Sequence, residues 1–387
     1  MKNYVLQTAL SCAVILLCNN LISAQAVTTP PGGGNQRSVV TQYIGSLVTV
    51  TIDYNSPDVH APNGDDRRGK IWGQLVPYGL NSLGFGASTP ENPSPWRAGA
   101  NQNTTIEFSH DVEVQGQKIA GGKYGLHMIP KENEAWTIIF SSNSDAWGSF
   151  FYTPDQDVLR VDATPEESEY HEWLTYEFTD RQAEEATVAM MWEDLKVPFT
   201  ITVPSMKEYY VNNLRNELQN TPGFNWQGWA AAANYCANND VNLEEALTWA
   251  ENGITAPFIG AKNWTTLSAK ATVLNKLGRK EEAIATMDEA IDDPSGTSFA
   301  IHGYGRTLIT QGEKEKALDV FKKNHKKFDG AWPTNYGLAR GYSANGDFKN
   351  ALKYLKIAQK NVPQGDTINP PVIEANIKKL ENKEDIN

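Results

Sequence analysis

Four residues close together in the chain, Trp96, Arg97, Asn101 and Thr104, could bind a ligand. Arg97 offers a planar guanidinium that forms paired hydrogen bonds with a carboxylate or a similar anion. Asn101 can both donate and accept hydrogen bonds, and Trp96 offers an aromatic face for stacking. These properties suit a saccharide, a peptide terminus or a carboxylate ligand. The structural alternative is that Arg97 pairs with an internal carboxylate and Asn101 caps a turn.

Histidines offer a second kind of chemistry. His60, His110 and His127 could meet beside aspartates in a metal site, but nothing in their spacing requires one. His127 follows Leu126 in an expected strand, where successive side chains point to opposite faces. We therefore expect the His127 side chain to face away from Leu126, toward solvent or a ligand pocket.

Arg67 and Arg68 follow two aspartates in an expected loop. The simplest interpretation is a solvated loop with local charge pairing, although either arginine could bind an anion. Motifs typical of nucleotide, dinucleotide, serine-hydrolase and zinc-protease sites are absent from the sequence. Cys236 lies in an Ala-rich segment, which is typical of a small buried residue in a helix. We therefore predict no catalytic residue, no bound metal and no cofactor.

The elements around the first cluster are predicted to be strands. Residues 37–204 contain short segments rich in β-branched and aromatic residues, separated by Gly, Pro, Asn and Asp. This pattern predicts an all-β sandwich. Residues 76–95 are expected to form a long loop, and loops of this length are usually functional or mobile. Its tryptophans could form a sugar-binding platform, but large aromatic residues in strands are more often core. The expected strands include 47–54, 104–108, 112–114, 136–140, 175–178, 187–192 and 199–203, and the tryptophans are Trp72, Trp136, Trp147, Trp173 and Trp192.

The period of the sequence changes after Pro204. Gly278, Gly312 and Gly346 lie 34 residues apart, and alanines follow each of them by five residues, at Ala283, Ala317 and Ala351. This is the period of tetratricopeptide repeats, in which stacked helix pairs bury a continuous core. Residues 205–387 are therefore predicted to form an all-α tetratricopeptide-type helical repeat array.

Two resemblances strengthen the assignment of the β-rich half. The segment Gly116–Leu126 resembles a turn-and-strand signature of prealbumin-like sandwiches, which implies a fold and no activity. The same half resembles a bacterial family of unknown function catalogued under the number 2911. That resemblance implies an envelope setting in Gram-negative bacteria and implies no reaction. The residues that carry it are 71–79, 96–105, 120–126 and 136–140.

The first residues predict export. Lys2 precedes an apolar run at residues 9–17 that is too short to span a bilayer, and Ala24-Gln25-Ala26 has the form of a cleavage site. We interpret residues 1–26 as a signal peptide and residues 27–36, rich in Pro and Gly, as a flexible tether. The predicted location is the periplasm or the extracellular space. A lipid anchor on Cys18 is the alternative, although Leu17 fits that pattern poorly.

The net charge of −12 argues against binding to nucleic acid, which requires a basic surface. We predict a non-enzymatic binding or scaffold protein that uses its helical repeats to hold a protein or peptide partner. One alternative is a sandwich that binds a carbohydrate or peptidoglycan fragment at the residues above. The other is a hydrolase with an unrecognised site.

Overall fold

The computed structural model describes residues 35–61 and 63–387, which belong to two compact units. The first unit ends at Pro204 and the second begins at Ser205. The predicted signal peptide and nearly all of the predicted tether lie outside the described residues, so both stay predictions. In the part of the chain that is described, every helix is too short or too polar to cross a membrane.

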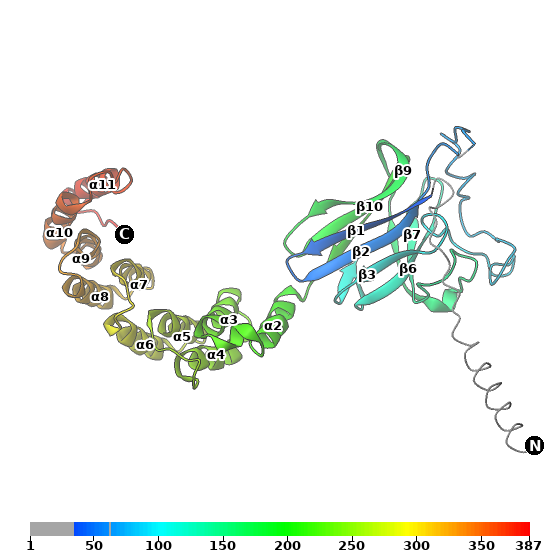
Figure 1. Ribbon diagram of the computed structural model, residues 1–387. Helices are drawn as coiled ribbons and strands as arrows, with labels where there is room; N and C mark the ends of the chain where they lie inside the picture. Colours follow the sequence, from blue (N-terminus) through cyan, green and yellow to red (C-terminus); the bar gives the residue numbers. More distant parts are fainter. Residues whose placement is uncertain (1–34, 62) are drawn as a thin grey trace, which may run out of the picture. The chain divides into compact units, whose positions relative to one another are not determined.

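Two antiparallel sheets form the first unit (Figure 1). The larger has the order β1-β2-β3-β6-β7-β8, with bounds Gln36–Ile44, Val48–Ser56, Thr104–Phe108, Gly122–Ile129, Trp136–Ser141 and Asp157–Ala163. The smaller has the order β5-β4-β10-β9, with bounds Gln117–Ile119, Val112–Val114, Glu185–Thr202 and Glu166–Arg181. A short 3-10 helix, η1 (Pro154–Gln156), precedes β8.

The core of this unit lies between the two sheets. On β2, Val48, Val50 and Ile52 alternate with partly exposed residues and are fully buried. Rings from the two sheets meet in this core, where Phe140 of β7 lies 6.4 Å from Phe199 of β10. The prediction of a β-rich unit is confirmed, whereas the finer assignment to prealbumin-like sandwiches stays a prediction.

One strand is longer than the sequence suggests. Residues 187–192 and 199–203 were expected to be separate strands, but β10 runs without a break from Glu185 to Thr202. Glu193 has a positive φ of 56°, and the pairing register with β9 shifts on either side of it. This β-bulge bends the strand without ending it.

Helical hairpins form the second unit (Figure 1). The pairs are α3 (Trp226–Asn239) with α4 (Leu243–Thr255), α5 (Trp264–Lys276) with α6 (Lys280–Asp292), α7 (Ser298–Thr310) with α8 (Lys314–Lys327), and α9 (Trp332–Ala344) with α10 (Phe348–Asn361). Helix α2 (Met206–Glu217) and a 3-10 helix, η2 (Thr221–Phe224), precede them, and α11 (Asn369–Glu381) follows.

The 34-residue period has a direct structural basis. Gly278, Gly312 and Gly346 follow the ends of α5, α7 and α9 with φ values of 77°, 84° and 79°, a conformation that favours glycine. The alanines five residues later are at most 1% exposed, because they pack where the two helices of a hairpin meet: Ala283, Ala317 and Ala351. The predicted repeat of helical hairpins is therefore confirmed.

Glycines on two helices make room for one large side chain of a third. Phe321 on α8 is fully buried and lies against Gly305 of α7 and Gly337 and Gly341 of α9. A Cβ atom at these glycines would lie 2.5, 2.6 and 2.8 Å from the Phe321 ring, respectively. The small residues of the repeat thus allow α7, α8 and α9 to pack closely around one aromatic ring.

Candidate functional site

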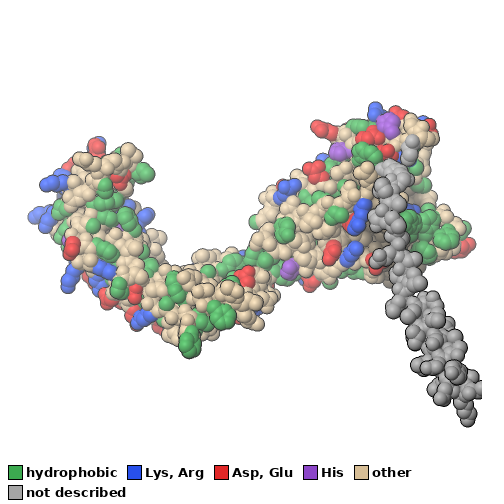
Figure 2. Space-filling model, viewed as in Figure 1, with side chains coloured by type: hydrophobic (Ala, Val, Ile, Leu, Met, Phe, Trp, Pro, Cys, Tyr) green, Lys and Arg blue, Asp and Glu red, His purple; other side chains and the backbone are tan. Residues whose placement is uncertain are grey.

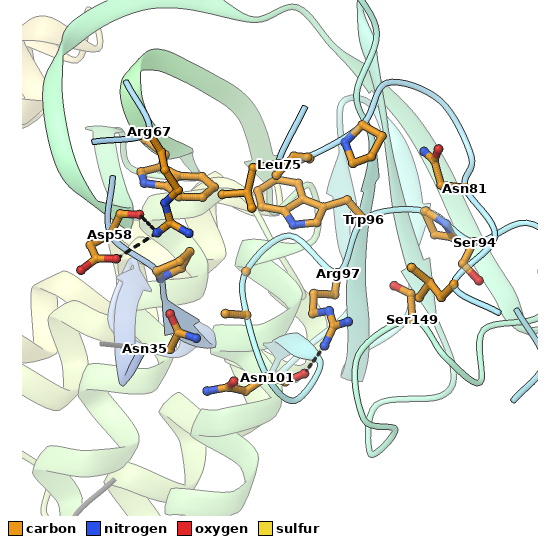
Figure 3. Close-up of a pocket in the computed structure, with 18 of the residues that line it drawn as sticks. Asn35, Asp58, Arg67, Leu75, Asn81, Ser94, Trp96, Arg97, Asn101 and Ser149 are labelled. Carbon is orange, nitrogen blue, oxygen red and sulfur yellow. Dashed lines mark hydrogen bonds and ion pairs between the residues drawn. The ribbon is translucent and has the colours of Figure 1, made fainter. Parts of the chain in front are cut away.

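Loops at one place in the β-rich unit surround a cavity of about 540 Å³ (Figure 3). The loop at residues 76–95, which the sequence singled out as functional or mobile, supplies part of its wall. Residues distant in sequence supply the rest. The lining includes Pro57, Asp58, Arg67, Leu75, Asn81, Leu83, Ser94, Trp96, Arg97, Asn101, Ser149 and Trp192. A cavity of this size is typical of a site for a small organic ligand.

Arg97 brings a positive charge to the cavity wall. Its Nη1 donates a hydrogen bond to the backbone oxygen of Asn101 at 2.6 Å, and its guanidinium carbon lies 5.2 Å from the centre of the Phe150 ring. Gly148 permits this packing, because a Cβ there would lie 2.3 Å from the guanidinium carbon. Among the described residues no carboxylate pairs with Arg97, so the alternative of an internal ion pair is wrong. Burial lowers the pKa of Arg97.

The other two candidate arginines have partners. Arg67 lines the cavity, but its Nη2 donates to the backbone oxygen of Asp58 at 2.8 Å and to its carboxylate at 3.1 Å. Arg68 does not line the cavity, and its guanidinium carbon lies 4.4 Å from the centre of the Tyr170 ring. The local pairing expected of this loop is therefore present at Arg67. Of the three candidate arginines, Arg97 is the one left to attract an anion into the cavity.

Tryptophans build one wall of the cavity and the core behind it. Trp96 and Trp192 are stacked with ring centres 6.4 Å apart, and Trp72 contacts both of them and Trp136 edge to face. Trp147 and Trp173, which the sequence grouped with these residues, are 52% and 42% exposed and do not line the cavity. The five tryptophans of the proposed sugar platform therefore do not share one surface.

Two other residues of the first cluster have structural roles. Thr104 is fully buried, and its hydroxyl donates to the backbone oxygen of Ala98 at 3.0 Å, so it does not line the cavity. Asn101 does line the cavity and has a positive φ of 57°, as expected of a turn residue. Its backbone oxygen, rather than its amide, holds Arg97.

His127 lies behind the cavity wall. It was expected to face solvent or a ligand pocket, but it is only 2% exposed and does not line the cavity, so it meets neither. The segment that contains Ser149 and Tyr152 covers it, and its Nδ1 lies 3.0 Å from the Ser149 hydroxyl. Burial, with a contribution from Arg97, lowers the pKa of His127 to about 4. A histidine with this pKa is a weak general base, which does not favour activation of the Ser149 hydroxyl as a nucleophile.

The buried His127 predicts a pH dependence of stability. The unfolded chain takes up a proton near pH 6.5, whereas the folded chain keeps His127 neutral until about pH 4. Stability is therefore highest above pH 6.5 and is lost as the pH falls toward 4, by roughly 2 kcal/mol at pH 5. Urea unfolding of wild type and His127→Gln at pH 7.5 and 5.0 measures this. The loss on acidification should be about 2 kcal/mol smaller in the variant, and an equal loss in both proteins would refute the assignment.

The histidines do not assemble a metal site. In the described ranges no three His, Cys, Asp or Glu side chains come together in a way that could hold a metal ion. His60 instead contacts Glu172, with 2.8 Å between its Nδ1 and the carboxylate. Cys236 on α3 is buried, and burial raises the pKa of its thiol to about 11.

A second candidate site lies on the helical array, where residues Glu384–Asn387 pack against α9 (Figure 1). Arg340 donates from Nη1 to the backbone oxygen of Ile386 at 3.3 Å. The backbone oxygen of Arg340 accepts a hydrogen bond from the side-chain amide of Asn387 at 3.1 Å. The Ser343 hydroxyl donates to the Asp385 carboxylate at 2.7 Å and accepts a hydrogen bond from the backbone N–H of Ile386 at 3.1 Å. The periodicity of the sequence gave no sign of this contact.

Ile386 anchors the segment. It is 5% exposed and belongs to the same apolar cluster as Tyr336 and Ala339 of α9 and Ile377 of α11. Burial of one such side chain contributes about 1.5–3 kcal/mol. The array therefore provides a pocket for an aliphatic side chain on a segment that has no regular secondary structure.

Positive charges lie beside this segment. A groove of about 580 Å³ is lined by Arg306 of α7, Lys314 of α8 and Arg340 of α9, together with Asp385. Within the described part of the chain, Arg306 and Lys314 form no ion pair, and the single side-chain carboxylate of the lining belongs to the segment itself. Figure 2 shows further Lys and Arg side chains on the surface of the last helices.

These features define a two-part protein: a unit of two antiparallel sheets with a ligand-sized cavity, and an array of tetratricopeptide-type helical hairpins. Residues 35–201 match the model of the family described as protein of unknown function (DUF2911), which confirms the resemblance seen in the sequence. A comparison with curated proteins found no match.

Solved structures similar to the helical region are tetratricopeptide repeat proteins. One from Parabacteroides merdae is 16% identical with a TM-score of 0.32, and the match covers 45% of this chain and 66% of that protein, just under two thirds of its length. YrrB, a protein with an unusual peptide-binding site, is 19% identical with a TM-score of 0.30. That match covers 45% of this chain and 84% of the YrrB chain. The C-terminal part of a repeat protein from Cytophaga hutchinsonii is 13% identical with a TM-score of 0.33. That match covers 46% of this chain and 70% of the other.

Proposed function

We propose that this chain is a non-enzymatic binding protein whose helical array holds an extended acidic segment of a partner protein. The binding surface is the face of α7 and α9 that carries Arg306 and Arg340, together with the adjoining Lys314. The observation that carries the proposal is the segment Glu384–Asn387, because it already lies on this face with an aliphatic anchor and backbone hydrogen bonds.

The chemistry of the partner follows from that segment. Its two carboxylates, Glu384 and Asp385, precede Ile386, and Asp385 is held by Ser343. Neighbouring hydrogen bonds keep the pKa of Asp385 below its usual range, so this group is charged at neutral pH although burial opposes it. A partner segment with acidic side chains beside one aliphatic residue would use the same contacts and would also neutralise Arg306 and Lys314.

The tethered segment should compete with such a partner. A linked segment acts at an effective concentration in the millimolar range, so a free peptide of similar affinity binds the intact chain weakly. A fluorescein-labelled peptide with the sequence of residues 381–387, Glu-Asn-Lys-Glu-Asp-Ile-Asn, tests this directly. Fluorescence anisotropy should show saturable binding to a chain that ends at Lys383 and at least roughly 100-fold weaker binding to the full chain.

Two controls make the result decisive. The full chain with Ile386→Asp keeps its length but loses the anchor, so it should also bind the peptide, even if the shortened chain is unstable. A peptide in which aspartate replaces the isoleucine should fail to bind both proteins. If neither protein binds the original peptide at 1 mM, the proposed use of this face is wrong.

A further inference from the structure

Residues that line the cavity of the β-rich unit carry polar groups without a protein partner among the described residues. Arg97 uses one donor on the Asn101 backbone and has no carboxylate partner among the residues described. Ser94 is 3% exposed and Trp192 is 1% exposed, and in the described part of the chain the hydroxyl of the first and the indole N–H of the second have no hydrogen-bond partner. Both residues line the same cavity as Arg97. Buried donors left without acceptors are rare in folded proteins and require an explanation.

The charge of the cavity contrasts with that of the unit around it. Residues 35–204 carry 24 Asp and Glu against 11 Lys and Arg, so the unit as a whole is strongly acidic. Among the described residues that line the cavity the single carboxylate is that of Asp58, and Arg67 already holds it. The cavity is therefore a local positive site within an acidic unit, and an anion is the ligand that its charge favours.

The remaining wall is apolar. Leu75 and Leu83 line the cavity although they are 45% and 40% exposed, and Trp96 adds a large aromatic surface beside Arg97 (Figure 3). Exposed leucines at the edge of a cavity gain free energy when a ligand covers them. A ligand that satisfies both parts of the wall has a charged acceptor at one end and an apolar body at the other.

We infer that this cavity binds a small organic carboxylate with an apolar tail, with the carboxylate on Arg97 and the tail against Leu75, Leu83 and Trp96. The planar fork of Arg97 matches the two oxygens of a carboxylate. This site is independent of the helical array, so it holds whether or not the array binds an acidic segment.

Octanoate is a suitable probe, because it combines one carboxylate with an apolar chain that a cavity of about 540 Å³ can hold. We expect saturable binding to the full chain by isothermal titration calorimetry. Octanol and octylamine, which have the tail without the negative charge, should bind at least roughly tenfold more weakly, and inorganic phosphate should not compete. Equal binding of all three octyl compounds, or displacement of octanoate by phosphate, would overturn the proposal.

Three variants locate the site. Arg97→Met should weaken octanoate binding roughly 10- to 100-fold, whereas Arg181→Met, which removes an exposed arginine of the same unit outside the cavity, should leave it unchanged. Leu83→Glu is at a partly exposed position and should fold even if Arg97→Met does not, and its new carboxylate should repel the probe. Octanoate binding that survives both Arg97→Met and Leu83→Glu, or no binding by the wild-type chain, would refute the inference.

Discussion

Replacing Phe321 with alanine should lower the free energy of unfolding of the helical array by about 3–5 kcal/mol. The ring is fully buried and fills a space that three glycines leave open, at Gly305, Gly337 and Gly341. The helices on either side cannot collapse into the vacated space without losing their contacts with each other. Urea unfolding followed by circular dichroism at 222 nm reports mainly on the helices and measures the effect.

Two glycines of one helix provide a matched control. Gly305→Ala would place a Cβ 2.5 Å from the Phe321 ring, and such overpacking typically costs about 1–3 kcal/mol. Gly303, also on α7, has open space around it, so Gly303→Ala should instead stabilise the helix by about 0.5–1 kcal/mol. Equal effects of the two substitutions would show that Phe321 does not occupy the position described.

Reversing two charges of the groove should weaken binding of an acidic segment by roughly tenfold. The variant Arg306→Glu with Lys314→Glu, in the chain that ends at Lys383, replaces attraction with repulsion at two positions that form no ion pair in the described chain. The measurement is the dissociation constant of the labelled peptide of residues 381–387. The loss should shrink as salt is raised, because salt screens exposed charges.

A change of the same net charge elsewhere separates local from overall electrostatics. Lys349 and Lys360 are exposed on α10, and neither lines the groove. Lys349→Glu with Lys360→Glu should change the dissociation constant less than about threefold. If this control weakens binding as much as the groove variant does, the peptide is attracted by net charge and not by the groove.

The repeat architecture was readable from the sequence because it depends on local rules. A glycine after each first helix must adopt a positive φ, and an alanine must pack at each hairpin crossing, so Gly312 and Ala317 recur at a fixed interval. The contact of residues 384–387 with α9 follows no such period. It depends on Ile386 and two side chains of α9 that are more than 40 residues away, Arg340 and Ser343, and a distant contact of this kind leaves no pattern in the sequence.

The candidate site in the β-rich unit was predicted in part. Residue type identified Trp96, Arg97 and Asn101, because an arginine beside an aromatic residue and an amide suits an anionic or polar ligand, and all three line the cavity. Strand alternation indicated that His127 faces away from Leu126, but alternation does not show which loop covers that side. Ser94 was missed, and Trp192 was named only as a possible platform for a sugar, because an unpartnered donor is recognisable only when its neighbours are known.

The binding of an acidic segment by α7 and α9 is tested most directly by a crystal structure of the chain that ends at Lys383, bound to the peptide of residues 381–387. We expect the peptide isoleucine to join the apolar cluster that contains Tyr336, Ala339 and Ile377, and the peptide backbone to accept a hydrogen bond from Arg340. A peptide found on α10 or on the β-rich unit would contradict this proposal, as would the absence of peptide from the face of α7 and α9 at saturating concentration.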